Sequence, residues 1–532
     1  MKQKTSGIAL IAALMIMVVV GLLVSSAVVT ASIQNRITRN DANATQAFFI
    51  AQYGAQEYKT LGYRTYSYMI RNLSNYSGLI SASGAGECAN ILGIGMDINR
   101  DGVIDQRDLR VGIPTAAQTV TLDDGSSGTF TITLLPAGRG IRSESTYRDA
   151  RSVVLVGWDV EETGVWNNAI FAGTGQSGNG INGNTNIYGS VNVRGSNLSI
   201  NDTAYDCSGN CGVFNSYSGD GTGSSNLGGL SEFNVPDSQR NINDLCSKVR
   251  VYQGDIKLRG SALIGTSTNK VKGVYVSNPV VSNDSTSQVD LESASRIHSE
   301  ETGPTKPVTA YDLASPTPFP NLDNGTPSYR TNLNTLATDV TACLAGRTSG
   351  TPPTFVLNSS TTSFNCTSAS GATIMAYNAS TNQLTLNGVA KLSGVNFSLQ
   401  RDVTYTGKGN LFLEKLPPLT GVGGNALLEG NLINASGTLN TYPQGASLGL
   451  TAEGNINANK NQQKLAGAFY AQGSMVIQKQ ATVLGTVVAN YFDLTQTPAL
   501  VQSPMLRYNL PPGMPGAGPT DYVFNIRAWE RR

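Results

Sequence analysis

Residues 97–108 carry the most specific chemical pattern in the chain, a series of oxygen-bearing side chains that reads DINRDGVIDQRD. An EF-hand-type calcium loop has twelve residues, takes ligands from positions 1, 3, 5, 7, 9 and 12, and turns at a glycine in position 6. Gly102 stands at the turning position. The predicted calcium ligands are Asp97, Asn99, Asp101, the backbone carbonyl of Val103, Asp105 and Asp108.

The last position of this loop departs from the usual pattern. Asp108 stands where an EF-hand has a bidentate Glu, and its side chain is one methylene shorter. We therefore expect a weaker affinity for calcium, which extracellular calcium concentrations still satisfy. The alternative is a turn rich in Asp and Asn that binds no ion.

A second cluster of candidate residues is basic. Residues 248–272 hold six Lys and Arg side chains against the single acid Asp255, with Tyr252 and Tyr275 within or beside them. Side chains two apart on a strand share a face, so such a stripe could follow a phosphate backbone with sequence-independent, salt-sensitive affinity. The alternative is a solvated strand face that protects a sheet edge from aggregation. The candidate DNA-binding residues are Lys248, Arg250, Lys257, Arg259, Lys270 and Lys272.

The cysteines and the single histidine constrain the chemistry further. The chain has no C-x-x-C, and His298 is its only His, so we expect neither a zinc site nor a Ser-His or Cys-His catalytic pair. The chain is therefore not expected to be an enzyme. Six cysteines predict disulfides in an oxidising compartment, with fifteen possible connectivities. The expected pairs are Cys343–Cys366 and one within the set Cys207, Cys211 and Cys246.

An apolar segment near the N-terminus indicates on which side of a membrane the candidate sites lie. Lys2 and Lys4 precede it, and residues 8–31 contain no charged side chain. As an α-helix the segment would span about 36 Å, enough to cross the roughly 30 Å core of a bilayer. The positive charges before it favour a cytoplasmic N-terminus. A cleavable signal peptide and an uncleaved signal anchor are the alternatives.

The residues around Gly7 indicate a third interpretation of this segment. The stretch from Lys4 to Ala12, KTSGIALIA, resembles a type III prepilin signal. Together with the later segment AFFIAQYGA at residues 47–55, it is similar to the PilX-like family of minor type IV pilins. The resemblance implies cleavage between Gly7 and Ile8 by prepilin peptidase. It also implies partnership with other minor and major pilins and with the pilus assembly machinery, first in the inner membrane and then at the cell surface.

Position 12 bears on where such a subunit would lie in a pilus. Major pilins carry a Glu five residues into the mature chain, where it meets the terminal amine of a neighbouring subunit, and Ala12 stands at that position here. A subunit with no subunit ahead of it avoids a costly unpaired carboxylate by lacking the Glu. The sequence therefore favours a place at the pilus tip.

The rest of the chain divides by its hydrophobic pattern. Helical periodicity continues beyond residue 36, and alternating strands are predicted over 117–134 and 142–160. Short strands with G-N-[IL]-x-[IV] stretches recur after residue 165, which favours a β-solenoid over a sandwich or a barrel. We expect an α+β pilin fold, a long N-terminal helix packed on an antiparallel sheet, carrying a large all-β insertion. The predicted parts are a leader at 1–7, a transmembrane and filament-core helix at 8–35, a head with the calcium loop at 36–164, the solenoid-like insertion at 165–504 and a return strand at 505–532.

Composition and layout leave three functional hypotheses. The net charge is +1, so any binding of DNA has to be local. The layout resembles the competence minor pilins of Thermus-type bacteria, which implies a tip subunit that contacts double-stranded DNA without sequence specificity during uptake. A tip minor pilin that serves as an adhesin or as an initiator of pilus assembly is the alternative. A solenoid enzyme of the envelope is disfavoured, because the acids of the insertion are scattered.

Overall fold

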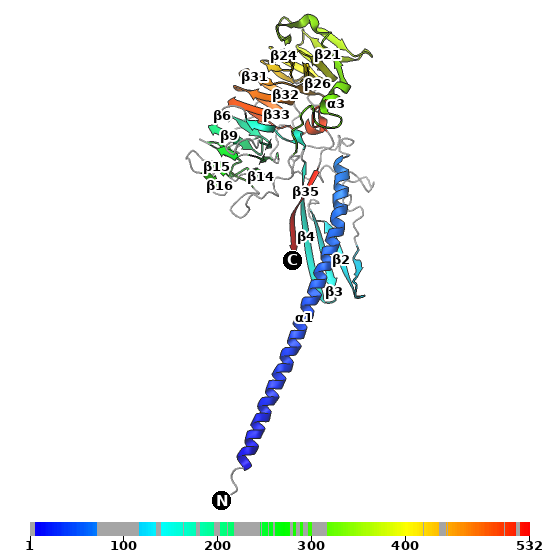
Figure 1. Ribbon diagram of the computed structural model, residues 1–532, viewed down its shortest axis with the longest axis vertical. Helices are drawn as coiled ribbons and strands as arrows, with labels where there is room; N and C mark the ends of the chain where they lie inside the picture. Colours follow the sequence, from blue (N-terminus) through cyan, green and yellow to red (C-terminus); the bar gives the residue numbers. More distant parts are fainter. Residues whose placement is uncertain are drawn as a thin grey trace. The chain divides into compact units, whose positions relative to one another are not determined.

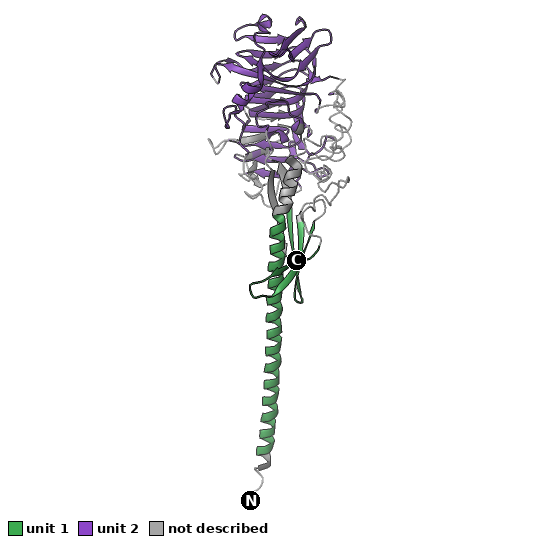
Figure 2. Cartoon of the chain, turned by 90° about the vertical axis from the view of Figure 1, so that its right-hand side faces the viewer, with its two compact units in different colours: residues 1–73, 95–161, 524–532 green, residues 74–94, 162–523 purple. Residues whose placement is uncertain are grey.

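The described residues fall into two compact units. The structure is a computed structural model that describes residues 6–71, 116–134, 140–162, 164–176, 181–195, 203–209, 211–217, 233, 245, 247–253, 255–258, 261–276, 280–282, 288–290, 296–299, 317–418, 420–435, 443, 445–504, 506–517 and 522–531. The first unit holds the N-terminal helix and a small sheet, and the second holds the remaining strands and short helices (Figure 2).

The first unit is organised along one long helix. This helix, α1 (Ser6–Arg71), contains 66 residues. Its stretch from Ala9 to Lys59 is long and apolar enough, by length and composition, to cross a membrane. Large apolar side chains from Leu10 to Ile37 are exposed in the single chain. A continuous exposed apolar surface of this kind marks a contact with membrane or protein.

A five-stranded sheet in the order β1-β2-β3-β4-β35 accompanies the helix (Figure 1). Its strands are β1 (Gln118–Thr121), β2 (Ser127–Leu134), β3 (Gly140–Tyr147), β4 (Ala150–Glu162) and β35 (Tyr522–Arg531). β1 to β4 pair antiparallel, and β35 comes from the far end of the chain to lie beside β4. The predicted combination of a long helix, a sheet and a large β-rich body is confirmed.

Small side chains allow the helix to approach this sheet closely. Ala47, Ile50 and Ala51 of α1 are buried against Phe130 of β2. A Cβ at Gly54 would lie within 2.5 Å of the Phe130 ring, so only glycine fits at this contact. A glycine inside a helix lowers the stability of the helix relative to alanine, and at Gly54 the close packing on Phe130 offsets this loss.

The second unit consists mostly of short strands stacked one above another (Figure 1). Their parallel pairings define three faces. In spatial order, face A contains β17 (Ala337–Asp339), β23 (Gly388–Ser393), β26 (Lys408–Leu416), β30 (Ser447–Ala452), β32 (Lys464–Ile477), β33 (Thr482–Gln496), β5 (Ile170–Gln176), β8 (Val191–Val193), β11 (Lys248–Val251) and β14 (Gly273–Val276). Face B contains β19 (Thr354–Leu357), β24 (Asn396–Leu399), β28 (Ala426–Leu428), β31 (Ile456–Ala458), the ends of β32 and β33, β6 (Ile181–Gly183), β9 (Thr203–Gly209), β12 (Asp255–Leu258) and β15 (Val280–Ser282).

The third face and the short antiparallel pieces complete this unit. Face C contains β22 (Gln383–Leu386), β25 (Val403–Thr406), β29 (Leu432–Asn434), the beginnings of β32 and β33, β34 (Ala499–Val501), β7 (Asn186–Tyr188), β10 (Gly212–Phe214) and β13 (Leu263–Ile264). Antiparallel additions are β16 (Gln288–Asp290), β18 (Thr348–Ser349), β20 (Phe364–Thr367), β21 (Thr373–Asn378) and β27 (Val422–Gly423). Among the described residues, the short helices are α3 (Tyr329–Leu336), η4 (Val165–Asn167), η7 (Ala345–Arg347) and η9 (Leu506–Asn509).

Apolar side chains in matching register fill the space between the three faces. On face A, Ile170, Val191, Val249 and Val274 lie opposite one another on successive strands, and all four are buried. Each side chain therefore packs on an equivalent one in the strands on either side. Strands of three or four residues are not stable alone, so the core depends on this stacking.

The chain enters this stack of strands in its middle. β33 pairs with β5 and β34 pairs with β7, so late strands lie directly against early ones. From β5 the chain builds the stack in one direction as far as β14, and the strands from β17 to β33 form the other part of face A. Gln502 joins the two parts, because its Nε2 donates to the Asn167 carbonyl at 2.8 Å and its Oε1 accepts from Ser190 N at 2.8 Å.

Face A is also covered on its outer side. Leu333 of α3, Leu506 of η9 and Met514 form a second apolar cluster with Phe412 and Tyr470 of the face. The strands at this place are therefore buried on both sides, which explains why they read as nearly continuous apolar runs.

The turns between faces create a testable requirement for glycine. Gly485 has a φ of +144°, and a Cβ there would lie 1.8 Å from the carbonyl oxygen of Gly467. We predict that Gly485→Ala lowers the free energy of unfolding of the second unit by roughly 2 kcal/mol or more, because it adds backbone strain to a steric overlap. Urea denaturation followed by circular dichroism measures this change.

Gly346→Ala is the matched control, because a Cβ at Gly346 meets no atom within 4 Å. We expect that control to change the free energy of unfolding by less than about 0.5 kcal/mol. Equal effects of the two substitutions would contradict the close contact at Gly485.

Candidate functional site

The basic stretch predicted to bind DNA is only partly exposed. Lys248 and Arg250 lie on β11 and are 7% and 5% exposed. Val249 between them fills the core, so the two cations lie on the other side of the strand. Lys270 is exposed and Lys272 is half-buried. Alternation along β11 predicts which side of the strand the cations occupy, but it carries no information about what covers that side.

Arg250 has a contact that gives it a role in the fold. Its guanidinium carbon lies 5.4 Å from the centre of the Tyr275 ring, and Arg250 and Tyr275 are register partners on β11 and β14. A cation over an aromatic face stabilises the pair of strands. Lys257 lies on β12, but its side chain, like the whole of Arg259, lies outside the described residues.

The predicted calcium loop and two of the six cysteines, Cys88 and Cys246, lie outside the described residues. All six predicted calcium ligands lie outside the described residues. Within the described part of the chain, no group of three or more His, Cys, Asp or Glu side chains is arranged to hold a metal ion.

One predicted disulfide is present, between Cys343 and Cys366. Cys211 is also disulfide-bonded. Cys207 lies on β9, and Cys246 lies outside the described residues.

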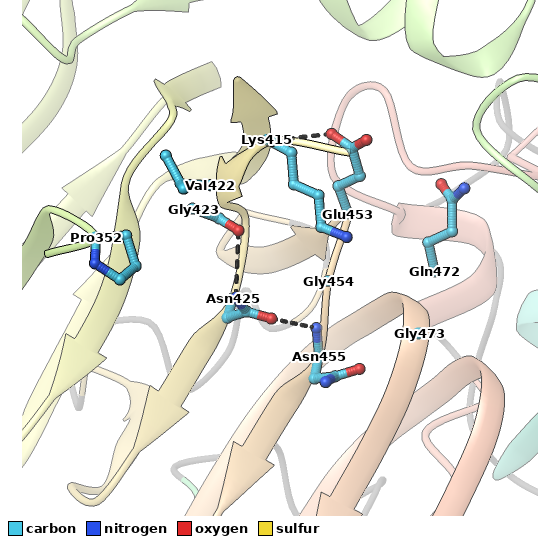
Figure 3. A pocket seen from close by; sticks show the side chains of 11 residues that line it. Pro352, Lys415, Val422, Gly423, Asn425, Glu453, Gly454, Asn455, Gln472 and Gly473 are labelled. Atoms are coloured by element: carbon cyan, nitrogen blue, oxygen red, sulfur yellow. Dashed lines mark hydrogen bonds between the residues drawn. The ribbon is translucent and has the colours of Figure 1, made fainter. Parts of the chain in front are cut away.

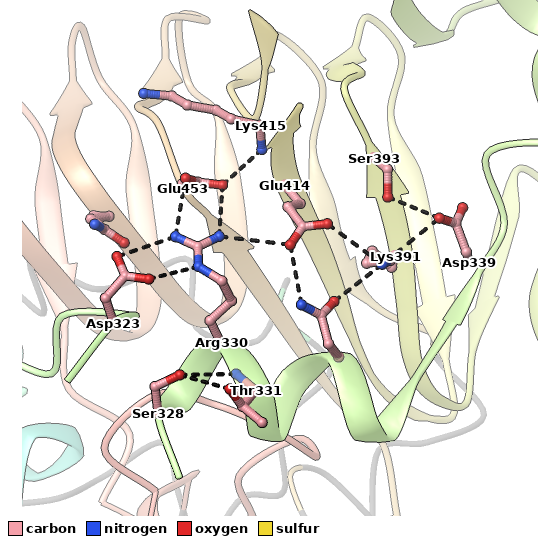
Figure 4. Close-up of polar contacts among 12 residues, drawn as sticks. Asp323, Ser328, Arg330, Thr331, Asp339, Lys391, Ser393, Glu414, Lys415 and Glu453 are labelled. Atoms are coloured by element: carbon pink, nitrogen blue, oxygen red, sulfur yellow. Dashed lines mark hydrogen bonds and ion pairs between the residues drawn. The ribbon is translucent and has the colours of Figure 1, made fainter. Parts of the chain in front are cut away.

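A buried ion network that sequence analysis missed lies on face A (Figure 4). Arg330, in the first turn of α3, donates two hydrogen bonds to Glu453, from Nη1 to Oε2 at 3.0 Å and from Nη2 to Oε1 at 3.1 Å. Its Nε and Nη2 also donate to Asp323, at 2.8 and 3.3 Å. A third carboxylate, Glu414 of β26, lies 3.7 Å from Nη1.

The charges in this network support one another. Burial disfavours the charged form of Arg330, but hydrogen bonds to Asp323 and Glu453 and their negative charges outweigh burial and raise its pKa. The hydrogen bond from Arg330 in turn lowers the pKa of Asp323. Because that pKa is lowered in the folded state, the contribution of Asp323 to stability is present above the ordinary Asp pKa and is lost as pH falls through the lowered one.

Lys391 extends the network along face A. Its Nζ lies 3.5 Å from Glu414 Oε2 and 3.8 Å from Asp339 Oδ2, and it donates to Asn334 Oδ1 of α3 at 3.1 Å. Burial alone would raise the pKa of Asp339, yet hydrogen bonds from Thr341 and Ser393 and the Lys391 charge lower it. These contacts hold α3 against the strands, and the arrangement is structural because each charged group is bound by the others.

A pocket of about 450 Å³ lies beside this network, where face A turns into face B (Figure 3). Its lining includes Lys415, Glu453 and Gln472. Three asparagines from successive strands form a row along the same corner: Asn425 N donates to Asn396 Oδ1 at 3.0 Å, and Asn455 N donates to Asn425 Oδ1 at 2.9 Å. The row fixes the backbone at the pocket.

Two comparisons with known proteins agree, one over the N-terminal segment and one over most of the chain. Residues 6–56 match the model of the PilX N-terminal family. The solved structure of the competence-associated pilin ComZ from Thermus thermophilus is similar over 93% of this chain and 98% of that chain, with 25% sequence identity and a TM-score of 0.56. The chain is a PilX-like minor type IV pilin. A search of curated proteins found no match.

Residues 6–56, which the family model covers, lie within helix α1 of this minor pilin. Gly7 and Ile8, the predicted cleavage site, lie in its first turn, and Ala12 follows on the exposed helix. As a pilin, the chain is anchored in the membrane by this apolar helix and then assembles with other pilins in the pilus.

The network on face A yields a prediction for the stability of the minor pilin. Arg330→Met leaves the buried carboxylate of Glu453 without its guanidinium, which costs about 3–5 kcal/mol of unfolding free energy. Chemical denaturation near neutral pH measures this loss. The loss shrinks as pH falls through the lowered pKa of Asp323, because Asp323 of the unsubstituted protein is then protonated and its charge no longer pairs with Arg330.

Lys460→Met serves as the control, since the side chains of its pair with Asp402 are 35% and 58% exposed, against 11% and 1% for Arg330 and Glu453. Exposed pairs contribute about 0–1 kcal/mol, so this substitution should change little. A loss no larger for Arg330→Met than for Lys460→Met would show that the network does not stabilise the second unit.

Proposed function

We propose that this minor pilin acts in DNA uptake during natural transformation, presenting its β-rich unit at the pilus tip. The observation that carries the proposal is the extent of the likeness to the competence-associated pilin ComZ. That likeness covers 93% of the chain, so it includes the large β-rich unit as well as the helix that all such pilins need. The large β-rich unit is therefore part of what this chain shares with a competence-associated pilin.

The β-rich unit is, in this proposal, a β-solenoid. The parallel pairings along faces A, B and C support this architecture, as do the apolar rows in matching register. A solenoid gives a pilus tip a long, regular surface whose side chains repeat from strand to strand.

The tip location rests on Ala12. The helix around it is apolar and exposed, and it carries no acid where filament-building pilins pair with the next subunit. A subunit that needs no such pair is suited to the end of the filament.

The contact with DNA rests on cations in the second unit. Lys270 is exposed, and the predicted stripe also includes Lys257 and Arg259. Lys248 and Arg250 are buried on β11 and in this proposal support the surface from beneath. The expected binding is to the phosphate backbone, without sequence preference.

Deletion of the gene in its natural host tests the proposal directly. We expect transformation to fall to background while pili are still assembled, because a tip subunit that receives DNA is not needed to extend the filament. Counts of transformants and electron microscopy of pili measure the two outcomes, and reintroduction of the gene is the control. Unchanged transformation, or loss of pili together with transformation, would contradict a dedicated role in DNA uptake.

A binding measurement on the purified protein separates contact with DNA from other roles at the tip. Affinity for double-stranded DNA should fall steeply between about 50 and 200 mM salt. Combined Lys257→Glu and Lys270→Glu should weaken it further. Lys460→Glu with Lys408→Glu changes the net charge equally, away from the predicted stripe. Absent or salt-independent binding would remove DNA contact and favour an adhesin or an initiator of pilus assembly.

We also propose that the loop from Asp97 to Asp108 binds calcium and stabilises the head. Chelation by EGTA should then lower the melting temperature of the full chain in detergent, because an ion that binds only the folded state stabilises it. Asp101→Ala should abolish the response to chelation, and Asp123→Ala, which removes an exposed acid outside the loop, should retain it. A melting temperature that does not respond to EGTA would exclude the calcium site.

A further inference from the structure

The pocket at the corner of faces A and B has features of a binding site that DNA uptake does not use. It lies next to the hairpin of β26 and β27, with Pro352 on one side and Gln472 on the other (Figure 3). Its volume of about 450 Å³ falls within the range of small-molecule sites in proteins. It belongs entirely to the second unit.

The charge of the lining argues against an anionic ligand. Lys415 and Glu453 are the charged residues of the lining, and they are of opposite sign. Glu453 is held by Arg330 and also accepts a hydrogen bond from the backbone N of Lys415 at 2.8 Å. A site for phosphate needs a surplus of positive charge, which this lining does not offer.

The uncharged polar groups suit hydroxyls. A carboxamide both donates and accepts hydrogen bonds, as a hydroxyl does. Asn425 uses its carboxamide in the row, where Nδ2 donates to Asn396 Oδ1 and to the Gly423 carbonyl. Asn455 uses only its Oδ1 there, which accepts from Ser474 N, so among the described residues its Nδ2 donates to none. Asn455 is exposed, so its carboxamide stands at the surface of the site. Gln472 is half-buried, and its Nε2 donates to Asn321 Oδ1 at 3.4 Å while its Oε1 is buried.

Glycine allows a ligand to come close to the backbone between these groups. Gly454 and Gly473 line the pocket, and a Cβ at either would lie 2.2 Å from the Oδ1 of the neighbouring asparagine in the row. The strands can carry no side chain here without breaking that row. The lining is thus smooth, and it is rigid because the asparagines and Glu453 are already bound.

An exposed apolar side chain, Val422, lines the pocket, and its register partner Leu416 lies next to it outside the lining. Leu416 and Val422 are 56% and 54% exposed, and they face each other across the β26–β27 pair. Outside α1, Leu336 is the one other large apolar side chain of the described residues with comparable exposure. Two exposed aliphatic side chains beside a polar lining match a ligand that has a hydroxyl-bearing edge and an apolar C–H face.

We propose that this pocket binds a neutral saccharide, one or two sugar rings of a surface polysaccharide. The ring hydroxyls bind Lys415 and Asn455, the ring lies on the Gly454 and Gly473 backbone, and its C–H face contacts Val422. This activity is separate from DNA contact, and it would let the pilus hold a surface as well as take up DNA.

The test is saturation-transfer difference NMR on the full chain, in a detergent without a sugar headgroup. The probes are N,N′-diacetylchitobiose, cellobiose and maltose, each titrated to give an affinity. At least one should bind, and Lys415→Met should weaken binding about tenfold or more, the effect of losing a hydrogen bond from a charged group. Val422→Asp should weaken it too, because it places a charge against the C–H face.

Two controls match these variants in the same unit. Lys408→Met removes a half-buried Lys at the other end of β26, and Leu336→Asp alters an aliphatic side chain of equal exposure on α3. Both should bind the saccharide as the unsubstituted protein does. Absence of binding to all three probes, or equal binding by pocket and control variants, overturns the proposal. Binding of a short oligonucleotide that Lys415→Met abolishes, with no saccharide bound, would assign the pocket to an anionic ligand instead.

Discussion

The register between parallel strands is the constraint on which the large β-rich unit depends. Its strands are mostly three to six residues long, and their backbone groups find partners only in the strands on either side. A side chain in the core must fit its equivalents in both neighbours, as Val191 fits Ile170 and Val249. The same requirement applies at the corners, where the backbone must change direction at the same place in each layer.

The corners meet this requirement with two residue types. Glycine provides backbone angles that other residues adopt only with strain, as at Gly485. Asparagine binds the next layer through its side chain, and the row through Asn396, Asn425 and Asn455 repeats this contact. A second row does the same at another corner, where Asn431 N donates to Asp402 Oδ1 and Lys464 N to Asn431 Oδ1. The pocket exists because one corner combines such a row with glycines and an extra hairpin.

Much of the local structure could be predicted from sequence, since it depends on neighbouring residues. Alternation indicated the strands of the small sheet, charge-free length indicated the N-terminal helix, and the Gly-Asn stretches indicated the parallel region. The ion network could not be predicted in this way, because Arg330 and Glu453 are 123 residues apart and nothing local to either identifies the partner. For the same reason, Lys248 and Arg250 could be assigned to one side of a strand, while their burial could not be foreseen. Local patterns also do not specify which strands pair with each other, so the parallel pairing of β33 with β5 could not be predicted.

The pairing of the late strands β33 and β34 with the early strands β5 and β7 has a mechanical consequence. The chain enters the stack of strands through η4 and leaves it after β34, and both of these connections lead to strands in the middle of the stack. The strands at the two ends of the stack come from the part of the sequence between these connections. Tension along the chain, such as a retracting filament would apply, therefore reaches the middle first and loads many backbone hydrogen bonds at once. Strands at the ends, which would peel one at a time, carry none of that pull. The second unit can therefore bear a pulling force without unfolding strand by strand from the ends of the stack.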